Sequence, residues 1–366
     1  MSSMPPEGPA GPPARVLVVK TGALGDVLRS TALLAALERR HPAGVSVTWL
    51  TARGARPLLE GLVRGGELAE LLDTGSADAA ALEGLTRELA ARGFDRVLSL
   101  DDEEPLCRLA SAVAGEPGRI TGACLDADGA RTYTDDAAPW FDMGLLSRFG
   151  KGRADELKVA NRRSHPDLLA EVVGAPLAPG QEPDAPRLRL DPGALAAAAA
   201  RLPEGGPRLG LNTGAGGRWT SKALPEERVV ALAEELVARH PGARLVLLGG
   251  PEEADRNARL AEACAHLPLW DAGTDNDLEA FGALVAGLDL VVTSDSLALH
   301  LAVASRVPVV AFFAPTSAAE IELYGRGEKV ASTAQDACSY RPDADTSTLT
   351  VARLAAAVDR VLAAGA

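Results

Sequence analysis

The chain has 366 residues, which at about 150 residues per domain favours two domains, and its 47% hydrophobic and 24% charged residues are typical of a globular protein with a large core. Acidic residues number 50 against 37 basic ones, and the net charge of −13 argues against a generally basic nucleic-acid-binding surface. The aromatic content of 4% argues against base-stacking platforms, and no apolar run reaches the roughly 18 residues needed to cross a bilayer.

The first half of the chain alternates predicted strands and helices. Residues 1–14 are rich in proline, with neither a basic region nor an apolar block, and are expected to be a disordered tail and not a signal peptide. Helical spacing of apolar residues fills 26–40, 78–92 and 104–114, and returns at 154–173 after an irregular stretch, 124–153. Short, apolar, β-branched runs predict buried strands at 15–19, 46–50, 96–100 and 119–123. This order predicts a mostly parallel sheet covered on both faces.

A proline-rich linker, 175–186, separates this block from a second one of the same kind. The second block has predicted strands at 208–212, 244–248, 290–293 and 307–313. Its predicted helices are 225–239, 252–266, 277–287, 297–305 and 348–364. We therefore expect an α/β protein with two Rossmann-like domains, 15–180 and 187–345, facing a central cleft, followed by a C-terminal helix, 346–366. In such sheets ligands bind outside the carboxyl ends of the strands.

Cysteine usage favours a reducing cytoplasm. The four cysteines lie far apart without a C-x-x-C pair, which argues against a zinc site or a disulfide framework. They are Cys107, Cys124, Cys264 and Cys338.

The loop after the first predicted strand, 20–26, contains two glycines but is neither the dinucleotide fingerprint nor a P-loop. Its last residue, Asp26, has two interpretations. A carboxylate there can cap the following helix, or it can act as a general base at the mouth of the cleft.

Two loops of the second block have features of an anion site, and a third loop carries acidic residues. The loop after the strand 208–212 holds three glycines in four residues, with Arg218 and Lys222 close by. After the strand 290–293, Ser294, Asp295 and Ser296 can cap the next helix, whose free N–H groups bind anions. His300 follows, either as a partly buried structural histidine or as a functional one. The third loop, 249–253, brings Glu252 and Glu253 to a helix start.

The order and spacing of these segments resemble glycosyltransferase family 9, which contains the ADP-heptose:lipopolysaccharide heptosyltransferases. The resemblance covers about residues 15–330. Its motifs are Val19-Lys20-Thr21-x-x-Leu24-Gly25-Asp26-Val27, Asn212 to Lys222, Leu248-Gly249-Gly250-Pro251-Glu252, Asp295-Ser296-x-x-x-His300-Leu301-Ala302, Pro315-Thr316 and Tyr324-Gly325.

The resemblance implies a GT-B fold with an acceptor-binding first domain and a donor-binding second domain, and a last helix that crosses back onto the first. It implies an inverting, metal-independent transfer without a cofactor, from a nucleotide sugar, with ADP-heptose expected, to a lipopolysaccharide-type or other cell-surface glycan. Asp26 is the implied general base and Lys222 the second catalytic residue. The implied donor-binding residues are Thr213, Gly214, Ala215, Arg218, Glu252 (or Glu253, for the ribose), Asp295, Ser296, Leu297 and His300. Expected acceptor-binding residues are Lys20, Thr21, Gly25, Arg162 and Arg163.

Two residues depart from the family pattern. Leu297 stands where glycine is usual, and its Cβ would crowd an approaching phosphate. Asn212 stands where histidine is frequent. Three other functions compete with the transferase: a nucleotide-sugar epimerase of the same architecture, a non-catalytic sugar-nucleotide or glycolipid-binding protein, and a nicotinamide dehydrogenase, which the missing fingerprint disfavours.

The region 148–163 carries a local charge of +4 in this acidic chain. Its basic residues are Arg148, Lys151, Arg153, Lys158, Arg162 and Arg163, against Asp155 and Glu156. This basic patch is interpreted either as a peripheral contact with an anionic glycolipid at the inner membrane face, or as a solvated helix face.

Overall fold

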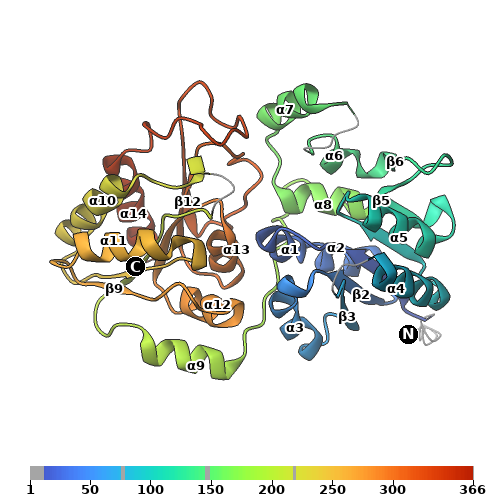
Figure 1. Cartoon of the computed structure of the whole chain (residues 1–366), viewed down its shortest axis with the longest axis horizontal. Helices are drawn as coiled ribbons and strands as arrows, with labels where there is room; N and C mark the ends of the chain where they lie inside the picture. Colours follow the sequence, from blue (N-terminus) through green and yellow to red (C-terminus); the bar gives the residue numbers. More distant parts are fainter. Residues whose placement is uncertain (1–11, 76–78, 145–148, 217–219, 366) are drawn as a thin grey trace, which may run out of the picture.

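The computed structural model describes residues 12–75, 79–144, 149–216 and 220–365. They form two α/β domains that lie side by side (Figure 1). Within the described ranges no helix is long and apolar enough to span a membrane. The four cysteines, all in those ranges, are free thiols.

The first domain is built on a six-stranded sheet of order β3-β2-β1-β4-β5-β6. Its strands pair in parallel except for β6, which runs antiparallel to β5. The strands are β1 (Ala14–Val19), β2 (Val45–Thr51), β3 (Glu70–Asp73), β4 (Arg96–Ser99), β5 (Ile120–Leu125) and β6 (Arg131–Tyr133). The helices are α1 (Leu24–Ser30), α2 (Leu33–Arg40), α3 (Pro57–Arg64), α4 (Ala79–Arg92), α5 (Glu104–Ala114), α6 (Ala138–Phe141), α7 (Lys151–Ala160) and α8 (His165–Val173).

The second domain repeats this strand order in a fully parallel sheet, β12-β11-β10-β7-β8-β9. Its strands are β7 (Arg208–Asn212), β8 (Arg244–Leu247), β9 (Leu269–Asp271), β10 (Leu290–Ser294), β11 (Val309–Phe313) and β12 (Gly327–Ala331). The helices are α9 (Pro192–Arg201), α10 (Glu226–Arg239), α11 (Ala254–Ala263), α12 (Leu278–Ala286), α13 (Leu297–Ala304) and α14 (Val351–Gly365). The predicted pair of Rossmann-like domains is confirmed. In both sheets the strand order reverses between two central strands, β1 and β4 in the first and β7 and β10 in the second.

Two predicted helices are each divided into two by local polar contacts. The stretch 26–40 breaks at Thr31, whose hydroxyl donates to Leu28 O (2.7 Å) and accepts from Arg187 N (2.7 Å). The stretch 154–173 breaks where Ser164 caps α8 by accepting from Asp167 N. The irregular stretch 124–153 contains β6, α6 and the start of α7, which are too short to show a period.

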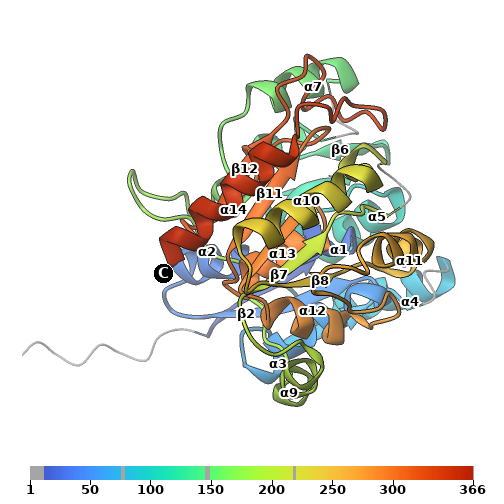
Figure 2. The same cartoon turned by 90° about the vertical axis from the view of Figure 1, so that its left-hand side faces the viewer.

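The C-terminal helix α14 lies on the second domain, beside α10, β11 and β12 (Figure 2). Its buried face joins the apolar core there through Leu354, Val358 and Val361. For the part of this helix that the structure describes, the expected return to the first domain is therefore wrong. The segment that contacts the first domain is the loop between β11 and β12, in which the carbonyl of Glu320 accepts from His165 N at the start of α8 (2.8 Å).

The two domains share an apolar boundary, because Leu28 and Leu58 of the first domain pack into a cluster that is otherwise made of second-domain residues. The linker is fastened along the first domain by ion pairs. These join Arg39 to Asp184, Arg187 to Glu38 and Arg189 to Glu67. Such contacts fix where the carboxyl ends of the two sheets meet.

Candidate active site

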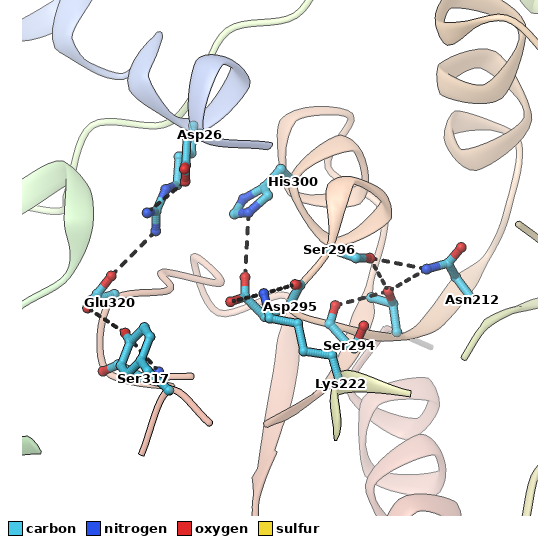
Figure 3. Close-up of polar contacts among 12 residues, drawn as sticks. Asp26, Asn212, Lys222, Ser294, Asp295, Ser296, His300, Ser317 and Glu320 are labelled. Carbon is cyan, nitrogen blue, oxygen red and sulfur yellow. Dashed lines mark hydrogen bonds and ion pairs between the residues drawn. The ribbon is translucent and has the colours of Figure 1, made fainter. Parts of the chain in front are cut away.

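The functional side chains gather where both sheets reverse their strand order. The loops after β1 and β4 come from the first domain, and those after β7 and β10 from the second. Helices α1 and α13 pack against each other at this place, and Figure 3 shows Asp26 facing His300 and Asp295 across the domain boundary. The approach is close: a Cβ on Gly25 would lie 2.4 Å from Cδ2 of His300. Open α/β sheets bind their ligands at such reversal points.

The loop after β1 is fixed by a buried carboxylate that follows β4. Asp101 pairs with the Lys20 ammonium and accepts from the Thr21 hydroxyl (2.8 Å) and the Thr21 amide. Lys20 also donates to Gly22 O. Both Lys20 and Thr21, which we expected to meet the acceptor, therefore shape the loop that presents Asp26.

Asp26 lies in the first turn of α1, and its carboxylate contacts Arg29 and not the helix end. The N-cap residue is Ala23, and none of the side chains that the structure describes caps this helix, so the capping interpretation is wrong. Asp26 Oδ1 lies 2.8 Å from Arg29 Nη2, with 36% of its side chain exposed. Burial alone would raise the pKa of Asp26, but the positive charge of Arg29, aided by Lys20 and His300, lowers it overall.

Sequence reasoning missed the partners of Asp26. Arg29 lies with its guanidinium over Trp140 (5.4 Å to the ring centre) and its Nη1 3.7 Å from Oε2 of Glu320. The Tyr340 hydroxyl donates to Glu320 Oε1 (3.2 Å). Burial, together with the nearby carboxylate of Asp295, raises the pKa of Glu320 in spite of Arg29. Arg29 lies three residues after Asp26 on one helix, a spacing that by itself indicates an ion pair. Trp140, Glu320 and Tyr340 come from separate parts of the chain and form no local motif, so no sequence signal indicated their place in the cluster.

Asp295 organises the second-domain side of the site. Lys222 Nζ donates to Asp295 O (2.7 Å) and lies 3.1 Å from Asp295 Oδ2, and His300 Nε2 lies 3.7 Å from Oδ1. Burial would raise the pKa of Asp295, but the positive charge of Lys222 and the neighbouring His300 hold it well below its usual range. Lys222 and His300 thus meet at one carboxylate, although the sequence only indicated that they lie in neighbouring loops.

The start of α13 is held by side chains of the adjoining strands. Asn212 Nδ2 donates to Thr293 Oγ1 (3.2 Å) and Ser296 Oγ (3.1 Å). Ser296 is the N-cap residue, yet no side chain in the described ranges makes the expected cap bond to this helix. The first amides of α13 therefore keep their capacity to bind an anion. Leu297, the first residue of α13, is partly buried against the apolar cluster at the domain boundary.

The glycine-rich loop after β7 is fixed at both of its described ends. Thr213 is fully buried, and Arg256 donates to its hydroxyl and its carbonyl (both 3.2 Å). Ser294 Oγ donates to Gly214 O (3.4 Å). Ala215 is half-buried, and Arg218 lies outside the described residues.

The two candidate ribose carboxylates differ in their environment. Glu253 accepts from the amides of Gly216 (2.6 Å) and Gly250 (2.9 Å) and so joins the loops after β7 and β8. Glu252 is exposed. The Glu253 oxygens are thus used within the fold.

The basic patch is largely neutralised. Lys151 pairs with Asp155, Arg153 with Glu156, and Arg163 with Asp167 and Glu171. Lys158 is buried with its ammonium over the Tyr340 ring (4.1 Å), and Arg162 donates to two carbonyls on the exposed surface. Arg148 lies outside the described residues.

The arrangement supplies an ionised carboxylate on one domain and a lysine, a histidine and a helix N-terminus on the other. That combination suits removal of a proton from one substrate and neutralisation of negative charge on a second. In the described part of the chain, no three His, Cys, Asp or Glu side chains group as metal ligands would.

Comparisons with known proteins agree with this geometry. No curated protein sequence matches the chain. By structure it is similar to a family 9 glycosyltransferase from Veillonella parvula DSM 2008 (18% identity, 96% of this chain and 97% of the other, TM-score 0.72). It is also similar to the E. coli ADP-heptose lps heptosyltransferase II (19% identity, 96% of this chain and 99% of the other, TM-score 0.67). A third similar structure is the E. coli heptosyltransferase WaaC with ADP-2-deoxy-2-fluoro heptose (20% identity, 96% of this chain and 100% of the other, TM-score 0.58). The family model of glycosyltransferase family 9 (heptosyltransferase) matches residues 158–348, just over half of the chain. The chain is therefore a glycosyltransferase that belongs to glycosyltransferase family 9.

Proposed function

We propose that this glycosyltransferase moves a heptose from ADP-heptose to a lipopolysaccharide-type or other cell-surface glycan, with inversion and without a bound metal. One observation carries the proposal: the Asp26 carboxylate of the first domain faces the Lys222–Asp295–His300 group of the second at the reversal points of both sheets. Such a division supports a reaction in which the acceptor hydroxyl binds on one side and the nucleotide sugar on the other.

In the proposed step the acceptor oxygen attacks the anomeric carbon in line with the departing diphosphate. A new C–O bond forms on the face opposite the one that breaks, which inverts the anomeric configuration. The hydroxyl proton passes to Asp26, whose lowered pKa keeps it ionised and ready to accept, and the nucleoside diphosphate leaves with the bonding electrons.

The leaving diphosphate gains charge as the bond breaks, and this charge needs compensation in the transition state. Lys222 is the proposed cation, because Asp295 fixes its ammonium beside the start of α13. The amides at that helix start and the loop residues Gly214 and Ala215 are the proposed phosphate ligands. The proposed donor site also includes Thr213, Ser296, Leu297, His300 and Glu252.

A transfer assay tests the reaction itself. Purified protein with ADP-heptose and a truncated lipopolysaccharide acceptor is expected to release ADP and form a product of inverted configuration at undiminished rate in chelator. Without acceptor we expect no comparable turnover. Efficient epimerisation of the donor alone would support an epimerase, and nucleotide binding without turnover on any acceptor would support a binding protein.

The donor nucleotide is proposed to be adenosine-based, since one of the similar structures is the E. coli heptosyltransferase WaaC with ADP. A ligand that binds only the native state raises the free energy of unfolding by about 2.7 kcal/mol at 100 times its Kd. ADP is therefore expected to raise the Tm, whereas UDP and GDP at equal concentration raise it little. A preference for UDP or GDP in the thermal-shift series would contradict the adenosine assignment.

The acceptor is proposed to contact the first domain near Gly25 and the basic patch, at the inner face of the membrane. Ion pairs offset the charges of Lys151, Arg153 and Arg163. Arg162, on the exposed surface, is therefore the residue there that we expect to contribute most to attraction of an anionic headgroup. This contact stays a prediction.

A further inference from the structure

Arg29 stands between two carboxylates that belong to different domains. Its Nη2 lies 2.8 Å from Asp26 on the same helix, and its Nη1 lies 3.7 Å from Glu320 of the second domain. Only 15% of the Arg29 side chain is exposed, and the Trp140 ring lies under the guanidinium. The cation is thus held in one place by contacts on three sides.

We propose that Arg29 is a positioning residue that orients the Asp26 carboxylate toward the acceptor and keeps it ionised, and that Glu320 moderates this action from the second domain. The inference rests on the proposed role of Asp26 as general base. It assigns a function in the reaction to two residues that lie outside the sequence motifs.

The orientation follows from the chemistry of the guanidinium. Its N–H groups form a rigid planar fork, so a carboxylate bound to Nη2 has a restricted direction. The other terminal nitrogen of the guanidinium, Nη1, lies 3.7 Å from Glu320, whose carboxylate accepts from the Tyr340 hydroxyl. A lysine could supply the charge but not this geometry.

The ionisation follows from the charges around Asp26. Lys20, Arg29 and His300 favour its charged form, whereas Asp295 and Glu320 oppose it. Arg29 in turn faces Asp26, Glu320, Asp295, Tyr340 and His165. An opposite charge within about 4 to 6 Å lowers a carboxyl pKa by about 1 to 3 units. Loss of Arg29 therefore raises the pKa of Asp26, and further loss of the Glu320 charge lowers it again.

The test is the acid limb of the pH profile of kcat/KM, measured on the full chain with donor and acceptor. Arg29→Gln is expected to move this limb up by about one pH unit, so that activity at acidic pH falls about tenfold more than activity on the alkaline plateau. Arg29→Lys keeps the charge and is expected to leave the limb in place while kcat falls. In Arg29→Gln/Glu320→Gln the limb is expected between that of wild type and that of Arg29→Gln.

The double variant removes the cation together with a buried anion and is the version to use if Arg29→Gln alone does not fold. Arg239→Gln is the matched control, because Arg239 also bridges two carboxylates, Glu235 and Asp359, far from the site. It should leave the profile unchanged.

A pH-independent loss of rate in Arg29→Gln would overturn the proposal for Arg29, and a double variant that matches Arg29→Gln would overturn the part played by Glu320. Asp26→Asn tests the base itself, so a dead Asp26→Asn with an unmoved limb in Arg29→Gln rejects only this inference.

Discussion

Replacing Asp26 by Asn is expected to lower kcat by about 10² to 10⁴, the range for loss of a general base. The amide keeps the shape of the side chain, and its oxygen can still accept from Arg29, so the fold should survive. It cannot take the acceptor proton at neutral pH. ADP affinity, measured by calorimetry, should stay near that of the wild type, because Asp26 lies on the domain opposite the proposed donor site.

Asp26→Ala completes the comparison. This change also removes one carboxylate from Arg29, and the loss of such a partly exposed pair costs about 1 kcal/mol or less. No cap bond is lost, because Asp26 makes none among the described residues. Turnover by Asp26→Asn within a few-fold of wild type, on a confirmed acceptor, would refute the proposed mechanism.

Replacing Lys222 by Ala is expected to lower kcat by about 10² to 10³, which is the cost of losing one donor to a developing negative charge. ADP should also bind more weakly, since the same ammonium meets the ground-state diphosphate. The effect is strengthened by Asp295, whose partly buried carboxylate would then face the phosphates without its cation. Single-turnover kinetics and ADP titration measure the two effects separately.

Lys329→Ala is the control for a lysine that is exposed on β12, away from the site, and it should leave both quantities unchanged. Lys222→Arg keeps the charge and should recover part of the rate. If Lys222→Ala binds ADP and turns over as the wild type does, Lys222 has no part in the donor site.

The sequence allowed prediction of the central strands but not of the sheet edges. Strands β1, β4, β7 and β10 have buried and mainly apolar centres, which is the pattern that periodicity detects best. Strands β3, β9 and β12 are short and carry charged residues, as in Gly327–Ala331, so their pairing depends on the neighbouring strand. The error over α14 has another cause: the expectation came from the family resemblance, and the apolar face of the helix does not say which surface covers it.

Candidate site residues could be singled out where a strand leads through a short loop into a helix. Asp295 and the glycine-rich loop directly follow strands, Asp26 lies in the first turn of the helix after β1, and sheet topology brings them to one edge. Arg29, Glu320 and Tyr340 do not share it. Glu320 and Tyr340 lie in irregular segments whose path depends on the domain boundary. The hydrogen bonds that join Glu253 to two loops also depend on the tertiary fold and not on a local pattern.

The close approach of Gly25 to His300 links the evolution of the two domains. The φ of Gly25 is not positive, so its backbone conformation would accept a side chain without strain. What prevents a larger residue there is the lack of space. The His300 ring occupies that volume. The side-chain volumes at positions 25 and 300 are therefore coupled across the domain boundary. A larger side chain at one position requires a smaller one at the other. A chimera that joins a first domain from one relative to a second domain from another inherits this constraint at a point that neither parental half reveals by itself.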